Sequence, residues 1–185
     1  MSALASMGQL RAGVLRWALV FVPLFVLLGS LSGLLSVSGP ENPWFAALQK
    51  PAIYPPPQTF GIVWTVLYAM MGLAMAIVVS ARGARGRGLA MSVFALQFLV
   101  NLSWSPVFFG AHQLTGGLIV IAVLDVLVLA TVLLFWRVRP VAGLLLLPYL
   151  AWIFFATFLN WTFLQANPAL DGVEGPRAAQ RIQLQ

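Results

Sequence analysis

Five long apolar runs with almost no charge account for most of this 185-residue chain. Each is long enough to cross the hydrocarbon core of a bilayer, roughly 30 Å thick, as a helix. A helix also satisfies the rule that backbone polar groups in lipid must be hydrogen-bonded within the protein. Because 61% of the residues are hydrophobic and only 8% are charged, the composition excludes an ordinary soluble domain. We expect an all-α membrane protein, a bundle of five transmembrane helices over residues 17–37, 60–80, 89–110, 116–136 and 141–164.

The first run follows Arg11 and Arg16, as the core of a signal peptide follows its charged start. It is about twenty residues long, however, whereas a signal-peptide core has about seven to fifteen. We therefore interpret it as a mature membrane helix. At the other end, residues 167–185 are polar and lack periodicity, so we expect a five-helix domain over residues 17–166 followed by a flexible polar tail.

The chain offers few residues for a metal centre or for common catalytic sites. It has no cysteine, which excludes disulfides, thiolate zinc sites and iron–sulfur clusters, and its only histidine is His112. It contains no Ser-His-Asp set, no pair of carboxylates and no phosphate-binding loop. The residues alone therefore predict no metal site and no required cofactor.

The net charge of +6 reflects topology rather than nucleic-acid binding. Seven Lys and Arg residues precede the first run or lie in the second and fourth connections, and three lie in the first connection or after the fifth run. Because cytoplasmic loops collect Lys and Arg, we expect residues 1–16 to form a cytoplasmic N-terminal segment and the C-terminus to lie outside. Helical spans are typical of the bacterial inner membrane, with the outer membrane as the alternative, and lipids are the expected partners.

The longest connection, residues 38–59, is rich in proline and would be stiff. Asn42 and Pro43 are typical of the start of a short helix, one face of which would carry Trp44, Phe45 and Leu48. That face would either lie at the membrane interface or fold back over the bundle. The connection is thus interpreted either as a rigid spacer or as a lid that covers a pocket.

Polar side chains inside the third run point to the interior of the bundle, because they are costly in lipid. Gln97 and Asn101 are four residues apart and share a helical face, and Trp104 follows three residues later. Two amides beside an indole suit a hydrogen-bonded ligand with a flat apolar body. The alternative is that the amides form hydrogen bonds between helices.

Aromatic residues in the second and fifth runs have helical spacing. Trp64 and Tyr68 are four apart, Tyr149 and Trp152 are three apart, and Asn160 follows Trp152 by eight. Rings that converge near one end of a bundle would suit a planar ligand. The alternative is a belt of aromatic residues at the membrane surface.

Three other features stand out within the runs. Asp125 is the only formal charge in any of them, and would be either a proton or cation site or a hydrogen-bonded structural residue. Gly29 and Gly33 permit close helix packing within the bundle or between subunits. Pro106 and Pro148 are expected to kink or loosen their helices.

Four segments, in this order, carry a family resemblance: FAALQKPAIYPP at 45–56, GIVWTVLYAMMG at 61–72, ALQFLVNLSWSPVFFGAHQ at 95–113 and PYLAWIFFATFLNW at 148–161. Together they resemble the translocator protein family, whose bacterial members are called tryptophan-rich sensory proteins and whose mitochondrial members are called peripheral benzodiazepine receptors. The resemblance implies a five-helix bundle, often a homodimer, in which the first loop closes a pocket. It further implies binding of porphyrins such as protoporphyrin IX, of sterols and of synthetic ligands. Carried over by motif, the pocket candidates are Trp64, Tyr68, Asn101, Trp104, Tyr149, Trp152, Ala156 and Asn160. The ligand-binding candidates also include Gln97, from the amide pair of the third run, and Ile53, from its place in the loop pattern.

Two departures from the family pattern bear on activity. Ile53 occupies the place of a loop tryptophan that the resemblance links, together with Trp152, to light-dependent porphyrin degradation. Its loss puts that reaction in doubt, although Tyr54 could partly substitute as a redox-active ring. The fifth run also lacks the Tyr and Arg of the sterol motif found in animal members, which mildly disfavours sterol binding.

These observations favour a membrane protein that binds porphyrins in tetrapyrrole sensing or transport, with sterols or other planar hydrophobic ligands as further candidates. The alternatives are a light-dependent porphyrin-degrading enzyme, with Trp152 and Tyr54 as candidate catalytic residues, and a membrane scaffold that binds no ligand. The porphyrin is expected as a ligand rather than as a required cofactor.

Overall fold

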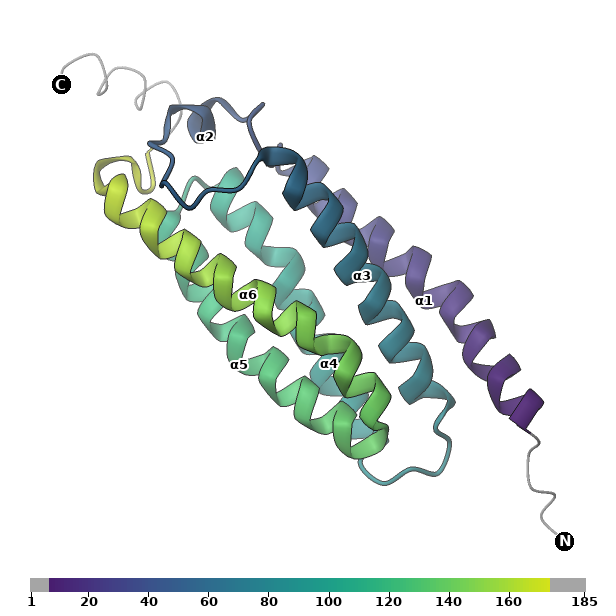
Figure 1. Cartoon of the computed structure of the whole chain (residues 1–185). Coiled ribbons are helices and arrows are strands. Elements are labelled where there is room, and N and C mark those ends of the chain that lie inside the picture. Colours follow the sequence, from purple (N-terminus) through teal and green to yellow (C-terminus); the bar gives the residue numbers. More distant parts are fainter. Residues whose placement is uncertain (1–6, 174–185) are drawn as a thin grey trace, which may run out of the picture.

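The computed structural model describes residues 7–173 and is a bundle of five long helices with a short helix across one end (Figure 1). The elements are α1 (Met7–Leu35), α2 (Pro43–Ala47), α3 (Pro57–Ser80), α4 (Arg87–Ser105), a π-helical turn η1 (Pro106–Gly110), α5 (Leu114–Val138), α6 (Pro140–Ala166) and a 3-10 turn η2 (Pro168–Leu170). Five segments are long and apolar enough to span a membrane: Ala12–Leu35, Pro57–Ser80, Arg87–Gly110, Leu114–Val138 and Pro140–Ala166. The expected all-α bundle of five membrane helices is confirmed, with most helices starting two to five residues earlier than expected.

The helices form a ring in which sequence neighbours are not always spatial neighbours. α1 packs along α3, α3 packs against α6, α6 against α5, and α5 against α4, which also touches α1. Small residues permit the closest crossings. A Cβ atom at Gly72 of α3 would lie 2.6 Å from the backbone of Val22 in α1, and Gly29 of α1 lies directly beneath the ring of Tyr68. Gly29 thus serves packing within the bundle.

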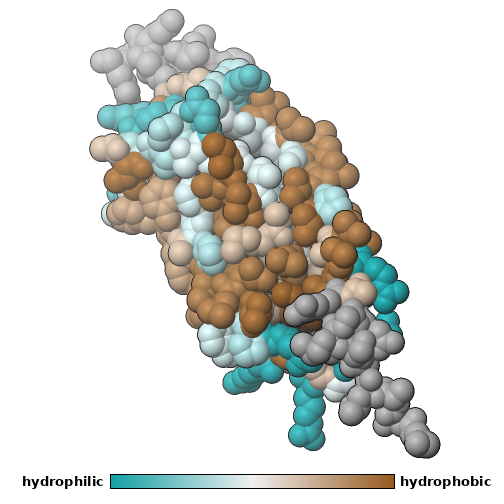
Figure 2. Space-filling view, turned by 45° about the vertical axis from the view of Figure 1, so that its right-hand side comes forward, coloured by the Kyte–Doolittle hydropathy of each residue, from teal (hydrophilic) through white to brown (hydrophobic). Residues whose placement is uncertain are grey.

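The two ends of the bundle differ in structure and charge. The connections at one end are the turns at residues 81–86 and at Arg139, and they carry the arginines of the second and fourth connections. The other end carries α2, the turn between α4 and α5, and η2. An apolar band lies between the two hydrophilic ends, as expected for a membrane protein (Figure 2).

The connection between α1 and α3 folds back over the bundle. Trp44, Phe45 and Leu48 are all almost fully buried, so the predicted apolar face of α2 points into the protein and not into the membrane interface. Asn42 caps α2 by accepting a hydrogen bond from the Phe45 N–H at 3.1 Å. Pro43 occupies the first turn, as the sequence predicted.

The described chain after α6 is packed, which differs from the expectation of a flexible tail from residue 167 onward. Leu170 is buried against the aromatic residues of α2, and Asp171 accepts hydrogen bonds from the N–H groups of Leu114 and Thr115, at 2.6 and 3.2 Å. Asp171 therefore caps the start of α5 from a distant part of the chain, a partner that local periodicity does not reveal. The rest of the predicted tail, 174–185, lies outside the described residues, as does 1–6 of the predicted N-terminal segment.

Candidate ligand-binding site

A chain of buried hydrogen bonds joins α3, α4 and α6 in the middle of the bundle. The Tyr68 hydroxyl donates to Asn101 Oδ1 at 2.9 Å, and Asn101 Nδ2 donates to the Tyr149 hydroxyl at 3.1 Å. The Tyr149 hydroxyl in turn donates to Gln97 Oε1 at 3.0 Å. All four side chains are buried. Four of the predicted site residues are thus brought together, in the interhelical arrangement that the sequence offered as an alternative.

Trp64 extends this cluster toward the α2 end. Its ring stacks on Tyr68, with centroids 5.3 Å apart, and meets Tyr149 edge-on at 6.2 Å. Trp64 is half-buried and packs against the core rather than standing free in the membrane surface. The interior position is that expected for a pocket residue.

Three further predicted residues carry buried polar atoms that have no hydrogen-bond partner: Trp104 Nε1, Trp152 Nε1 and Asn160 Oδ1. The other end of the Asn160 amide is satisfied, because its Nδ2 donates to the Leu114 carbonyl at 3.0 Å. Buried polar groups are nearly always paired in proteins, so unpaired ones call for an explanation. Two donors and one acceptor are therefore free in the upper part of the bundle, near α2.

Aromatic rings surround these free atoms. Trp104 stacks on Phe108 at 4.8 Å, and Phe108 and Asn160 Oδ1 both lie within about 3 Å of the position that a Cβ would take at Gly117. Trp152 meets Phe60 edge-on at 5.8 Å. The residues that carry the free polar atoms thus pack beside aromatic side chains, a combination that is common in small-molecule sites.

The loop residues point in opposite directions. Tyr54 contacts Phe60 and Phe163, with centroids 5.5 and 5.6 Å apart, so it faces the interior, and burial raises the pKa of its phenol. Ile53 is 41% exposed, so this predicted ligand residue faces outward. Ala156 is half-buried on α6, one turn from both Trp152 and Asn160.

Several hydrogen bonds hold the α2 loop, the connection over residues 36–56 that contains α2, against the bundle. Asn42 Nδ2 donates to the Phe109 carbonyl, and Trp44 Nε1 donates to the Leu170 carbonyl, both at 3.1 Å. Asn167 pairs with both backbone groups of Gln49, at 2.7 and 3.0 Å. Lys50 donates to the carbonyls at the end of α2 and lies over the Phe45 ring, and burial lowers its pKa. The loop therefore folds back over the end of the bundle and is held there.

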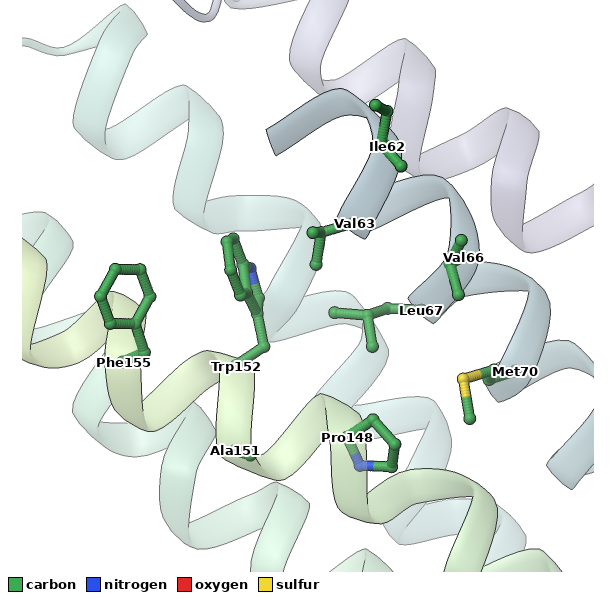
Figure 3. A pocket seen from close by; sticks show the side chains of 9 residues that line it. All are labelled: Ile62, Val63, Val66, Leu67, Met70, Pro148, Ala151, Trp152 and Phe155. Carbon is green, nitrogen blue, oxygen red and sulfur yellow. The ribbon is translucent and has the colours of Figure 1, made fainter. Parts of the chain in front are cut away.

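A groove lies between α3 and α6, lined by side chains of both helices (Figure 3). Its volume is about 510 Å³, and its walls are almost entirely apolar. Ile62 and Val66 at its outer edge are more than half exposed, whereas Trp152 lies on its inner wall. The full lining is Ile62, Val63, Val66, Leu67, Met70, Pro148, Ala151, Trp152 and Phe155.

Sequence reasoning did not single out Phe60, Phe108 and Phe155, which complete the aromatic walls. A phenylalanine in a membrane span carries no polar signal, so periodicity alone cannot separate an inward ring from a lipid-facing one. It also missed Thr157, whose hydroxyl lies 2.8 Å from Asp125 Oδ2. Asp125 and Thr157 lie on different helices, α5 and α6, so only the packing of these two helices reveals the pair.

Comparison with known proteins decides the family. Residues 20–165 match the sequence profile of the TspO/MBR family. The chain belongs to this family. It is 41% identical over 130 residues to the "Tryptophan-rich protein TspO" of Chlorobaculum tepidum, a match that covers 70% of this chain and 82% of that protein. It is 37% identical over 134 residues to "Protein CrtK" of Rhodobacter capsulatus, covering 68% and 79% of the two chains, and 34% identical over 147 residues to the "Translocator protein" of Homo sapiens, covering 78% and 87%.

Family membership agrees with the structural result. The protein is an integral membrane protein of the TspO/MBR family, with five apolar helices and a loop that closes one end. The matched region contains every predicted ligand-binding residue from Ile53 to Asn160.

Proposed function

We propose that the protein binds a porphyrin such as protoporphyrin IX between the aromatic walls beneath the α2 loop, in tetrapyrrole sensing or transport. The observation that carries this proposal is the set of unpaired buried atoms, Trp104 Nε1, Trp152 Nε1 and Asn160 Oδ1. All three belong to residues that the family resemblance assigns to the pocket. A ligand with both acceptors and donors on a flat apolar body would satisfy them.

Porphyrin chemistry meets these requirements. The macrocycle is planar and stacks on aromatic rings, its propionate groups accept hydrogen bonds from indole N–H groups, and its pyrrole N–H groups donate to an amide oxygen. The Tyr68, Asn101, Tyr149 and Gln97 side chains form the floor of this site in our proposal, because their polar atoms are already engaged with one another. Sterols and other planar hydrophobic ligands would use the same apolar walls.

The α3–α6 groove is the entry route that we propose from the membrane. It opens between exposed Ile62 and Val66, and Trp152 forms its inner wall. An apolar ligand dissolved in lipid would reach the bundle there without crossing the fastened α2 loop. Rotation of the Trp152 ring would then connect the groove with the interior.

The test is a titration of the detergent-solubilised protein with protoporphyrin IX in the dark, following the absorption band of the porphyrin. Trp104→Phe and Trp152→Phe retain an aromatic ring but remove the free indole N–H. We expect each variant to weaken binding about five- to tenfold, since one hydrogen bond contributes about 1 kcal/mol or slightly more. Trp161→Phe is the matched control, because Trp161 lies on α6 but is 46% exposed and stacks on Phe158, which is itself exposed. Equal binding by all three variants and the wild type would refute the proposed site.

A second candidate function is light-dependent porphyrin degradation, which one contact favours. Phe60 lies between Tyr54 and Trp152, stacked on the first ring and edge-on to the second. The three rings form a row from Trp152 to the loop. When a bound porphyrin is illuminated in the presence of oxygen, an oxidising equivalent would pass along this row to Tyr54. Illumination with oxygen should then bleach the porphyrin band faster than in empty micelles, and more slowly in Tyr54→Phe. If Ile53→Trp also shows no more bleaching than micelles, this candidate fails.

We further propose that the N-terminus is cytoplasmic, that the C-terminus lies outside the inner membrane, and that the protein forms a homodimer. The support for the orientation is the excess of arginine at the end of the bundle opposite α2. Because the chain has no cysteine, single variants such as Glu41→Cys and Arg85→Cys report each end separately. A membrane-impermeant maleimide added to spheroplasts should label the first and spare the second, and the reverse pattern would invert the topology.

A further inference from the structure

Asp125 lies deep in the membrane-spanning part of α5, and its hydrogen-bond partner Thr157 follows Ala156 on α6. It is eleven residues from the start of α5 and thirteen from its end, which corresponds to about 16 and 20 Å along the helix axis. The nearest cationic side chain along α5 is Arg137, about 18 Å away. Among residues 7–173, no ion pair to Asp125 is present.

The hydrogen bonding of Asp125 leaves a charge without compensation. Its Oδ1 is buried and has no partner, and its Oδ2 has one, the hydroxyl of Thr157 in α6 at 2.8 Å. A carboxylate with one hydrogen bond, one buried unpaired oxygen and no cation is strongly unfavourable, whereas a neutral carboxylic acid leaves only one uncharged acceptor unpaired.

The Thr157 hydroxyl lies within hydrogen-bond distance of two acceptors. It is 2.8 Å from Asp125 Oδ2 and 2.9 Å from the backbone carbonyl of Ile153. A hydroxyl has one proton and can donate to only one of them at a time. If Asp125 is protonated, its own O–H donates to Thr157 Oγ1 and the Thr157 hydroxyl donates to the Ile153 carbonyl. Both short contacts are then hydrogen bonds.

The other titratable groups near Asp125 supply no cation, although the buried Tyr149 hydroxyl interacts with it electrostatically. On the elements that pack against α5, the described titratable side chains are Tyr149 of α6, Tyr68 of α3 and Arg87 of α4. The two tyrosine hydroxyls are engaged in the central hydrogen-bond chain, and Arg87 donates to the Val78 carbonyl at the far end of the bundle.

We propose that Asp125 and Thr157 form a proton-binding site within the membrane, in which Asp125 is a neutral carboxylic acid that links α5 to α6 and is open to lipid-soluble carbodiimides. Access from lipid is available, because Asp125 is only half-buried and Val126 and Phe158 beside the pair are more than half exposed. The O–H of the acid adds across one C=N bond of the carbodiimide: the carboxyl oxygen bonds to the central carbon and the proton moves to nitrogen. The acyl group then moves from oxygen to the other, unprotonated nitrogen, which gives a stable N-acylurea with no leaving group.

The experiment treats the purified full chain in detergent with dicyclohexylcarbodiimide at mildly alkaline pH and measures its intact mass and peptide map. We expect one adduct, mapped to the peptide that contains Asp125 and lost in Asp125→Asn, whose amide can still donate to Thr157. Glu41→Gln, which removes an exposed carboxylate, and Thr157→Ser, which retains the hydroxyl, should label like the wild type. An adduct that persists in Asp125→Asn would overturn the proposal.

If the carbodiimide gives no adduct, infrared spectroscopy of the untreated wild type and Asp125→Asn tests whether Asp125 is protonated. The wild type should show the carbonyl stretch of a protonated carboxylic acid at mildly alkaline pH, and Asp125→Asn should lack it. Identical spectra would show that Asp125 is ionised and would refute the proton site. Neither readout requires a porphyrin, so this result is independent of the proposed ligand.

Discussion

Replacing Tyr149 by phenylalanine should destabilise the bundle more than the same replacement at Tyr68. The Tyr149 hydroxyl donates to Gln97 and accepts from Asn101, so its removal leaves two buried polar groups, Gln97 Oε1 and Asn101 Nδ2, without these partners. Within residues 7–173, the Tyr68 hydroxyl makes one side-chain hydrogen bond, to Asn101. Tyr149 therefore joins two amides of α4 to α6, whereas Tyr68 joins one of them to α3.

The expected cost follows from the number of bonds lost. Hydrogen bonds between membrane helices contribute on average about 0.6 kcal/mol, and at most about 1.7, while a buried group left unpaired costs about 1 to 3. Tyr149→Phe, which breaks two bonds, should lower the free energy of unfolding by about 1 to 3 kcal/mol. Tyr68→Phe, which breaks one, should cost about half as much.

The assay is reversible unfolding in mixed micelles of mild detergent and dodecyl sulfate, followed by circular dichroism for the wild type, both single variants and the double variant. Because both tyrosines bind Asn101, the two effects should be non-additive in the double variant. The reasoning would be refuted if the free energy of unfolding of Tyr149→Phe lay within about 0.3 kcal/mol of the wild-type value. It would also be refuted if Tyr68→Phe lowered the free energy of unfolding more than Tyr149→Phe does. Porphyrin affinity should change less than in Trp104→Phe, since the hydrogen-bond chain is the floor of the proposed site.

Two further predictions concern packing and capping. Gly29→Ala should lower the free energy of unfolding by about 1 to 3 kcal/mol, because the new methyl group would overlap the ring of Tyr68. Gly33→Ala should be nearly neutral, because the nearest atom to a Cβ there is the Ser38 hydroxyl at 3.9 Å. Equal effects of the two variants in thermal unfolding would contradict this packing. Asp171→Ala should cost about 0.5 to 2 kcal/mol because it removes the cap from the start of α5, and faster amide hydrogen exchange at Leu114 and Thr115 would identify the cause; unchanged exchange would argue against it.

Much of the fold could be predicted because hydrophobic length is a direct physical signal. The number of spans, the turn into α2 at Asn42 and Pro43, and the loosening of the helix at Pro106 all follow from local chemistry. At Pro106 the chain forms a π-helical turn, in which the Ala111 N–H donates to the Pro106 carbonyl at 2.8 Å. The packed segment after α6 was not predicted, because its partners Trp44 and Leu114 are far away in sequence.

The candidate site was predictable in its members but not in its connections. Polar and aromatic residues within lipid-spanning segments are costly or distinctive, so Gln97, Asn101 and Tyr149 stood out. Which of these side chains bind one another could not be derived, because that depends on residues of α3, α4 and α6 lying at the same level of the bundle. Ile53 shows the limit of transfer by motif, because its position in a family pattern did not reveal that its side chain faces outward.

The sequence by itself determined the solvent and the architecture of this protein. Lipid forces each span to satisfy its own backbone, so five apolar runs imply five helices, and the four ordered motifs imply the family. Only the tertiary structure decided which polar atoms are free. Among the described residues, Gln97 and Asn101 are engaged, whereas Trp104 Nε1, Trp152 Nε1, Asn160 Oδ1 and Asp125 Oδ1 lack partners. Hydrogen bonding is short-ranged and directional, so it is fixed by where helices distant in sequence come together.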